Sequence, residues 1–417
     1  MMKIRFFDLD RWEEIFLTLK TNKLRSLLTA FGIFWGVFML ILLMGGSNGL
    51  KTMLGSTFTG FATNSYFIMP AKTDLPYKGF QKGRSWKLET ADLQRLRNQI
   101  PELETITPVF SLWGAKATVG SRQMDCDMKG VDADFTQVEN ADMTQGRFLN
   151  ESDIQARRKV CVIGKRVAEE LFPGISNPCG MRIQVKGVYF QVIGVNSRSG
   201  ASLMGNAETS IQTPYTTLQR IYHMGNEVQC IGMTVKKGYT VSEVAPKVDV
   251  FIKRIHLIHP DDQQALFGMN MEMMFQMIDN LFRGISILVW MIGLGTLFTG
   301  AVGVSNIMMV TVRERTNEIG IRRAIGAKPK DIMWQILSES MVLTVLAGLS
   351  GIVSAVWLLQ GIENIMAARN NLDASFQISF FIAIGAAVFV AFLGVLAGMA
   401  PAFRALAIKP IDAMRDE

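Results

Sequence analysis

Few residues in this chain combine a reactive side chain with the spacing that catalysis requires. Residues 45–49 match the pattern G-x-S-x-G, in which Ser47 would be the nucleophile of a hydrolase. Such a nucleophile lies on a turn between a strand and a helix, whereas an apolar run of membrane-spanning length precedes Ser47. We therefore expect residues 45–49 to be a flexible exit from a membrane span, and we expect no catalytic residue in the chain.

Two groups of side chains have the types that bind metal ions. Residues 256–262 hold two histidines and two aspartates, but their spacing is not that of a zinc site, and a solvated turn after a helix explains them better. Met269, Met271 and Met273 alternate and would share one face of a strand. Their thioethers suit Cu(I), although methionine also fills gaps in apolar cores. We expect neither a metal site nor a cofactor.

The chain has four cysteines, which all fall between its first two long apolar runs: Cys126, Cys161, Cys179 and Cys230. In an oxidising compartment they could form two disulfides in three different pairings, and the sequence does not choose among them. Cys161 lies within an apolar, strand-like segment, which favours a buried free thiol at that position.

Four long apolar runs determine where the other segments of the chain lie relative to the membrane. They cover residues 27–50, 284–312, 332–362 and 374–403. Each exceeds the roughly 20 residues that a helix needs to cross a bilayer. The first is too long for the apolar part of a signal peptide and no A-x-A site follows it, so we expect it to remain as a span. Within it, Gly32 and Gly36 form G-x-x-x-G, a spacing that lets another helix approach closely.

The charges between the runs predict the orientation. Charged residues make up 19% of the chain, against about 25% in soluble proteins, and the net charge of +7 is accounted for by basic residues near the ends of the runs. Because short basic loops stay in the cytoplasm, we expect residues 1–26, a loop at 313–331 and a tail at 404–417 to be cytoplasmic. Apolar residues at helical spacing predict that residues 1–26 form an amphipathic helix. Residues 51–283 and 363–373 then lie outside. A frayed terminus is the alternative to the amphipathic helix. The basic residues cluster near the ends of the runs without aromatic residues between them, which argues against a nucleic-acid partner.

Residues 51–283 have the character of a soluble α/β domain. Strands are predicted at residues 65–69, 105–119, 160–163 and 228–235, with a hairpin at 181–195 that turns at Lys186-Gly187. Helices are predicted at residues 90–100, 164–172 and 241–256, the first capped by Thr90 and the last by Thr240 or Ser242. The segment exceeds the usual size of a single domain, which indicates two lobes. The expected fold class is a membrane protein with four transmembrane α-helices and a large two-lobed α/β extracytoplasmic domain between helices 1 and 2.

The basic loop between the second and third runs is the main candidate for contact with a partner. Residues 313–335 carry six lysines and arginines against three acids. Two sets of side chains recur at the helical spacing of three and four residues: Glu314, Glu318, Ile321 and Ile325 in one set, and Ile319, Arg322 and Arg323 in the other. Gly326 and Pro329 are typical of a helix end, and a second helix is expected to start near Asp331. An ordinary solvated basic loop is the alternative.

The string E-R-T-N-E-I-G-I-R-R-A-I-G-A at residues 314–327 closely resembles the cytoplasmic loop motif of the MacB/FtsX/LolC superfamily of ABC transporter permeases. Three further segments, residues 140–153, 160–172 and 188–195, look like the periplasmic core domain of the MacB type. The resemblance covers nearly the whole chain in the same order of parts. It implies a membrane-proximal lobe and a distal lobe, at residues 51–118 with 226–275 and at residues 119–225, respectively.

The resemblance also implies a role for the loop. In this superfamily the loop forms a coupling helix that docks on the ATPase. Carried over residue by residue, the ATPase contact consists of Glu314, Arg315, Glu318, Ile321, Arg322, Arg323, Gly326 and Ala327.

A member of this superfamily would be a non-catalytic, multi-pass permease subunit of the bacterial inner membrane with both termini in the cytoplasm. The sequence has no G-x-x-x-x-G-K-[ST] run to hold ATP phosphates, so the expected partners are a separate ABC ATPase, a second permease copy or paralogue, and membrane lipid. A periplasmic adaptor and an outer-membrane channel would join them for export. Mechanotransmission would then drive efflux or export of a drug, a peptide or a lipoprotein. The rival is a membrane receptor or regulator with a ligand-binding outer domain, which explains the topology but not the loop motif.

Overall fold

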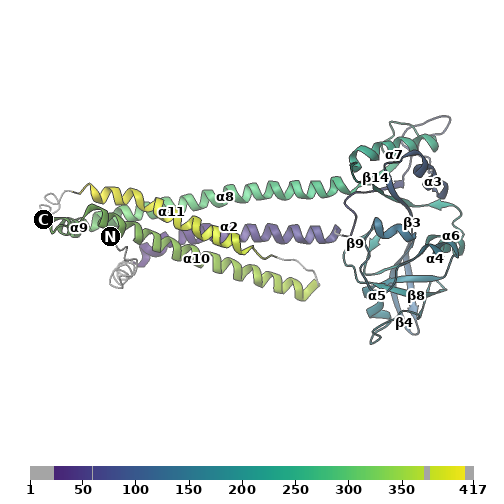
Figure 1. Cartoon of the computed structure of the whole chain (residues 1–417), viewed down its shortest axis with the longest axis horizontal. Coiled ribbons are helices and arrows are strands. Elements are labelled where there is room, and N and C mark those ends of the chain that lie inside the picture. Colours follow the sequence, from purple (N-terminus) through teal and green to yellow (C-terminus); the bar gives the residue numbers. More distant parts are fainter. Residues whose placement is uncertain (1–22, 59, 371–375, 409–417) are drawn as a thin grey trace. The chain divides into compact units, whose positions relative to one another are not determined.

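The structure is a computed structural model that describes residues 23–58, 60–370 and 376–408. Two compact units are present, one formed by Met1–Met53 with Leu281–Glu417 and the other by Leu54–Asn280. Figure 1 labels most of the helices and some of the strands. Most of the amphipathic helix predicted at residues 1–26 and the end of the predicted tail lie outside the described residues.

Long helices dominate the first unit. Within the described residues they are α2 (Lys23–Phe58), α8 (Met271–Glu314), α10 (Pro329–Asn370) and α11 (Phe380–Leu406). All four are long and apolar enough to cross a membrane. The predicted fold class, with four membrane helices and an α/β domain between the first helix and the rest, is therefore confirmed (Figure 1).

The helices do not end where the apolar runs end. α2 continues to Phe58 without a break, and α8 already begins at Met271, because the polar residues that flank the runs also suit a helix. α11 begins only at Phe380, later than the predicted residue 374, and it continues past Pro401 to Leu406. Pro401 does not end the helix, since neighbouring groups can satisfy the backbone that a proline frees inside a membrane helix.

Small residues bring the membrane helices close together. A Cβ added to Gly300 of α8 would lie 3.1 Å from the backbone of Gly32 in α2, and one added to Gly36 would lie 3.2 Å from Leu297. The prediction that the G-x-x-x-G spacing admits a neighbouring helix is thus confirmed, with α8 as that neighbour.

The second unit contains the α/β domain. Its strands are β1 (Ser65–Pro70), β2 (Leu88–Glu89), β3 (Leu103–Val119), β4 (Arg122–Val131), β5 (Met143–Gly146), β6 (Val160–Gly164), β7 (Arg182–Val185), β8 (Val188–Asn196), β9 (Ala201–Ser202), β10 (Gly205–Asn206), β11 (Ser210–Pro214), β12 (Glu227–Val228), β13 (Cys230–Val235) and β14 (Leu266–Asn270). Its helices are α3 (Thr90–Gln99), η1 (Ala133–Gln137), α4 (Glu151–Gln155), α5 (Lys165–Leu171), α6 (Tyr215–Ile221) and α7 (Val241–Ile255).

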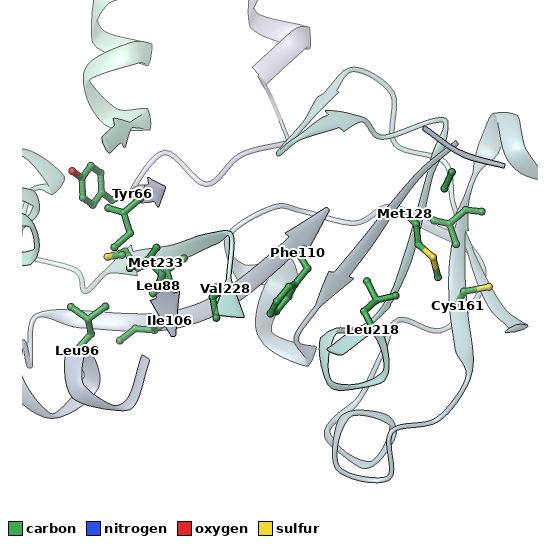
Figure 2. Packing of buried hydrophobic residues seen from close by; sticks show 14 of the residues in the cluster. Tyr66, Leu88, Leu96, Ile106, Phe110, Met128, Cys161, Leu218, Val228 and Met233 are labelled. Atoms are coloured by element: carbon green, nitrogen blue, oxygen red, sulfur yellow. The ribbon is translucent and has the colours of Figure 1, made fainter. Parts of the chain in front are cut away.

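One sheet organises this domain. Its strand order is β14-β1-β13-β3-β4-β11-β6-β8-β5, and β7 pairs with both β3 and β8, which closes β3, β4, β11, β6, β8 and β7 into a ring. The first half of β3 pairs with β13 and the second half with β4 and β7. β3 therefore belongs both to the part of the sheet that contains β13 and to the ring, and the lobe boundary expected near residue 118 falls at the end of this shared strand. Both parts contribute to one large apolar cluster, from which Figure 2 shows Leu96 and Ile106 at one end and Met128 and Cys161 at the other.

Several local predictions are confirmed and others are wrong. The hairpin between β7 and β8 turns at Lys186 and Gly187, both at positive φ (47° and 83°), as a tight two-residue turn requires. The predicted cap at Thr90 is wrong, because Glu89 is the N-cap and exchanges hydrogen bonds with Asp92 in a capping box. All four cysteines are free, and Cys161 is fully buried.

The methionine prediction is also wrong. β14 ends at Asn270 and α8 begins at Met271, so Met269 and Met273 lie on different elements rather than along one strand face. Met271 is fully buried, whereas Met273 is 54% exposed. The prediction assumed that alternate residues lie on one face of a continuous strand. It does not hold here because the chain changes from strand to helix at Met271 without an intervening loop.

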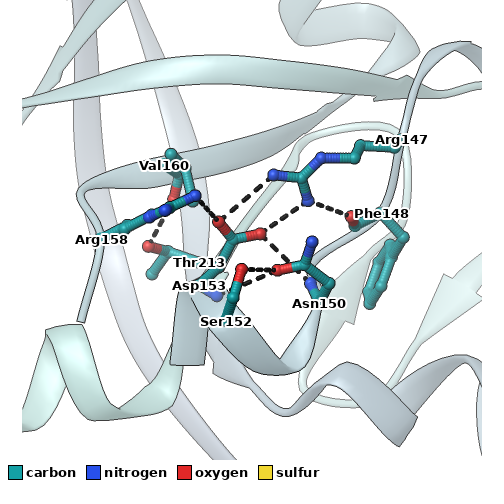
Figure 3. A network of polar contacts seen from close by, with 8 residues as sticks. All are labelled: Arg147, Phe148, Asn150, Ser152, Asp153, Arg158, Val160 and Thr213. Carbon is teal, nitrogen blue, oxygen red and sulfur yellow. Dashed lines mark hydrogen bonds and ion pairs between the residues drawn. The ribbon is translucent and has the colours of Figure 1, made fainter. Parts of the chain in front are cut away.

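A buried carboxylate secures the start of α4. Asp153 forms a two-armed contact with Arg147, at 2.6 Å and 3.2 Å, and Arg158 lies 3.4 Å away (Figure 3). Asp153 also accepts the backbone N–H of Asn150 at 3.2 Å. Burial acts to raise the pKa of Asp153, but the hydrogen bonds from Arg147 and from the Asn150 N–H outweigh burial and hold that pKa below its ordinary value.

We expect Asp153→Asn to lower the free energy of unfolding by about 1–3 kcal/mol at neutral pH. Because the folded-state pKa lies below the unfolded value of about 3.9, the contact stabilises the native state above about pH 4 and is lost as the pH falls through the folded pKa. The cost of Asp153→Asn should therefore shrink as the pH drops from about 5 to about 2, measured by thermal unfolding of the purified full chain. A cost that stays constant over this range would contradict the assignment.

Candidate functional site

The basic loop folds as a short helix between two sharp breaks. α8 ends at Glu314, and α9 spans Thr316–Ala324. Gly326 then adopts φ 108°, a conformation that favours glycine, and its N–H donates to the carbonyl oxygen of Arg323 at 3.2 Å. α10 begins at Pro329 rather than near Asp331, because proline is well tolerated in the first turn of a helix.

One face of α9 is fixed to α10. Arg315, just before α9, lies 3.5 Å from Glu339, whose side chain is 8% exposed. Arg322 donates to the side-chain oxygen of Gln335 at 2.9 Å. Ile319 between them is 8% exposed and packs in the apolar cluster of the first unit. These contacts turn two of the predicted arginines toward the chain itself.

The same face of α9 is also fixed to the end of α11. Arg323 donates to the carbonyl oxygen of Leu406 at 3.0 Å and to that of Ile408. The last carbonyl groups of a helix lack partners within the helix and carry partial negative charge, so a guanidinium group is well suited to them. Arg323 thereby joins the loop to a helix end that lies 83 residues away in sequence.

The opposite face of α9 is exposed and partly apolar. Ile321 is 50% exposed and Ile325 is 82% exposed. Glu318 lies on this side and pairs with Arg322 at 2.7 Å, with side chains 49% and 37% exposed. Trp334, near the start of α10, is 58% exposed. Two large apolar side chains at a spacing of four residues on a charged loop are typical of a surface that a partner covers.

The eight residues predicted for this site therefore divide into two groups. Glu314, Glu318, Ile321 and Gly326 are exposed, whereas Arg315, Arg322, Arg323 and Ala327 are partly buried. The prediction omitted Ile325 and Trp334. The signal for Ile325 was present, because it shares the helical spacing of Ile321, but nothing in the sequence marks Trp334.

We expect Gly326→Val to impair the loop without preventing membrane insertion. A β-branched residue at φ 108° is strained, at a cost of at least about 1–2 kcal/mol. No atom lies within 4 Å of a Cβ added at Gly326, so the effect is conformational rather than steric. Limited proteolysis should cut the loop of the variant faster while the α/β domain keeps its resistance. Identical cleavage of both proteins would show that the turn is not required.

The other candidate residues serve packing. Residues 45–49 lie inside α2, which excludes both a nucleophile turn and the predicted flexible exit. A Cβ on Gly45 would lie 2.3 Å from Leu359, and one on Gly49 would lie 2.1 Å from Phe376, so these glycines make room for neighbouring side chains.

The predicted solvated turn at residues 256–262 is bonded to its surroundings. His256 lies 2.8 Å from Asp92, and Asp262 accepts four backbone N–H groups. Asp262 is 1% exposed, so this part of the turn is buried rather than solvated. In the described part of the chain, no three His, Cys, Asp or Glu residues are placed to hold a metal ion.

Two family models match the chain. The MacB-like periplasmic core domain covers residues 26–250, and the FtsX-like permease C-terminal region covers residues 290–410. The chain is 29% identical over 403 residues to the macrolide export ATP-binding/permease protein MacB of Bdellovibrio bacteriovorus, which covers 96% of this chain and 61% of that protein. It is also 29% identical over 400 residues to the pyoverdine export ATP-binding/permease protein PvdT of Pseudomonas fluorescens, covering 95% and 58%. The chain thus spans about three fifths of the length of these relatives.

Among solved structures, the periplasmic region of MacB from Actinobacillus actinomycetemcomitans matches with a TM-score of 0.43 and 21% identity. This match covers 54% of the present chain and 96% of the other.

Proposed function

Since the chain belongs to the family of ABC transporter permeases with a MacB-like periplasmic core domain and an FtsX-like permease region, we propose that it couples ATP hydrolysis by a separate ATPase to movement of its α/β domain during export. The observation that carries this proposal is the two-sided arrangement of α9. Its outer face exposes Ile321 and Ile325, while its inner face is bonded to α10 and α11.

The partner on the outer face is proposed to be an ABC ATPase. The printed names of the relatives combine ATP binding with a permease, and the present sequence has no G-x-x-x-x-G-K-[ST] run. The proposed ATPase is carried by a separate chain. Closure of that ATPase would push on α9, and the contacts of Arg315, Arg322 and Arg323 would pass the movement to the membrane helices.

The proposed cargo is a drug, a peptide or a lipoprotein, and the relatives are named for macrolides and pyoverdine. The proposed assembly pairs this chain with a second copy or a paralogue. Its membrane is the bacterial inner membrane, with the α9 loop in the cytoplasm because the loop is short and basic.

Affinity purification of the full chain in mild detergent from its native cells tests this proposal. An ATPase subunit should co-purify, and ATP hydrolysis in the eluate should be lost when the Walker lysine of that subunit is replaced. A chain that purifies without any ATPase from cells in which it is functional would favour a receptor with a ligand-binding outer domain.

A further inference from the structure

A buried group of charged side chains lies in the α/β domain. Glu139 and Arg198 form an ion pair of 2.5 Å, with side chains 1% and 5% exposed. Glu139 also accepts the hydroxyl proton of Ser202. Lys129 of β4 donates to that same hydroxyl oxygen at 2.5 Å. A lysine–serine pair can serve as a nucleophile, but Ser202 is 6% exposed and its proton is directed to Glu139, so a structural role fits better.

The backbone at Glu139 is paired with the segment that leaves α2. Residues 60–62 and 138–140 are joined by two amide–carbonyl hydrogen bonds of 2.9 Å and 2.8 Å, and their central residues form an antiparallel bridge. A Cβ added at Gly60 would lie 1.7 Å from Cζ of Arg198, so the guanidinium group lies directly against the glycine backbone.

We propose that Glu139 acts as a strap that fastens the exit of the first membrane helix to β4 and β9. Its backbone holds residues 60–62. Its carboxylate holds β9 through the hydroxyl group of Ser202 and the N–H of Leu203, and it holds β4 through Ser202 and Lys129. The fastening stands on these contacts alone, whereas its use in force transmission rests on the proposed function.

The strap gives the two helices that connect with this domain different points of attachment. α8 follows β14 without a loop, and β14 pairs with β1 at one end of the sheet. α2 is fastened through Glu139 to β4, which belongs to the ring of strands. A displacement of one helix relative to the other would therefore act on two different parts of one sheet.

Hydrogen–deuterium exchange of the full chain in lipid nanodiscs tests the strap. Gly60→Ala displaces Arg198 without changing any charge, and it should raise amide exchange at least tenfold at residues 60–62 and 201–206 while β13 stays within about twofold. Gly55→Ala is the matched control, since nothing lies within 4 Å of a Cβ at Gly55. Unchanged exchange at residues 201–206, or an equal rise in β13, would overturn the proposal.

Two further variants distinguish the contacts of Glu139 with residues 60–62 from its contacts with β4 and β9. They also keep the test valid if Gly60→Ala does not fold. Ser202→Ala retains the pair of Glu139 with Arg198 and the hydrogen bond from the Leu203 N–H to Glu139, but it cuts the link to Lys129, so exchange should rise in β4 and not at residues 60–62. Asp153→Asn removes a different buried carboxylate of the same unit and should leave residues 60–62 within about twofold. An equal response of residues 60–62 to these two variants and to Gly60→Ala would overturn the proposal. No ATPase takes part in these measurements, so failure of the strap and failure of the proposed function are told apart.

Discussion

Replacing Ile321 of α9 and its C-cap residue Ile325 by serine is expected to weaken association with the ATPase by about thirtyfold or more. Ile321 and Ile325 are 50% and 82% exposed in the unbound chain, and burying one such side chain contributes about 1.5–3 kcal/mol. Because Ile321 is already half-buried, covering the exposed parts of both side chains contributes about 2–4 kcal/mol, which is about thirtyfold or more in affinity. Binding of purified ATPase to the nanodisc-embedded permease measures the effect.

The control for this experiment is another exposed aliphatic side chain. Val250 on α7 is 61% exposed, and Val250→Ser should change neither ATPase binding nor thermal stability. If the double isoleucine variant keeps its affinity while it remains folded, the outer face of α9 is not the docking surface.

The charged residues of the loop should respond differently from the isoleucines. Glu318 and Arg322 form an ion pair with side chains 49% and 37% exposed. A pair this accessible to solvent is worth under about 1 kcal/mol, so Glu318→Ala should weaken binding less than about fivefold. Arg323→Ala should leave binding within about threefold but lower transport per ATP, because it releases α11 from α9 without altering the outer face. A loss of affinity in Arg323→Ala as large as in the isoleucine variant would mean that Arg323 reorients to meet the ATPase.

The sequence predicted the membrane helices well because each corresponds to a long apolar run, and the length of such a run is enough to identify a span. A charge-free run such as residues 284–312 has no stable place in water, so its existence as a span follows from composition alone. The first turns of α8 were missed for the opposite reason. Met271 to Arg283 includes Glu272, Asp279 and Arg283, and only its helical backbone, which the sequence does not display, connects it with the span.

The sequence predicted that α9 has two different faces, but not which face contacts the rest of the chain and which is exposed to solvent. Helical spacing separates Ile321 and Ile325 from Arg322 and Arg323. Composition alone would place the arginines in water and the isoleucines against the chain. The structure reverses this, because the carbonyl groups at the end of α11 require donors and Arg323 supplies them from a distant part of the sequence. Contacts between residues so far apart in sequence cannot be predicted from the spacing of neighbouring residues.

The α/β domain shows the same division between local and distant information. β3 was predicted nearly in full from its β-branched and aromatic residues, but not that its two halves pair with different strands. The strap could not be predicted at all. Glu139, Arg198 and Lys129 are ordinary surface residue types in sequence, and only the fold buries them together.

The contact between α10 and α11 depends on the absence of side chains at two positions. Ser340 of α10 places its Oγ 3.0 Å from the carbonyl oxygen of Gly394 in α11. A Cβ added at Gly398 would lie 2.2 Å from the same Oγ, and one added at Gly394 would lie 2.0 Å from the hydroxyl oxygen of Thr344. Close approach of this kind is how small residues stabilise pairs of membrane helices.

We therefore expect Gly398→Leu to separate α10 from α11 and to abolish recovery of monodisperse protein, because overpacking a close helix contact costs about 1–3 kcal/mol or more. Gly398→Ala should be destabilised less, and Ser340→Ala should partly rescue it, since Oγ is the atom that the new Cβ would strike. Gly385→Leu, on the same helix but with nothing within 4 Å of its Cβ, should behave as the parent protein. Size-exclusion profiles and thermal unfolding in one detergent compare the four variants. Equal behaviour of Gly398→Leu and Gly385→Leu would show that α10 and α11 do not meet at Gly398.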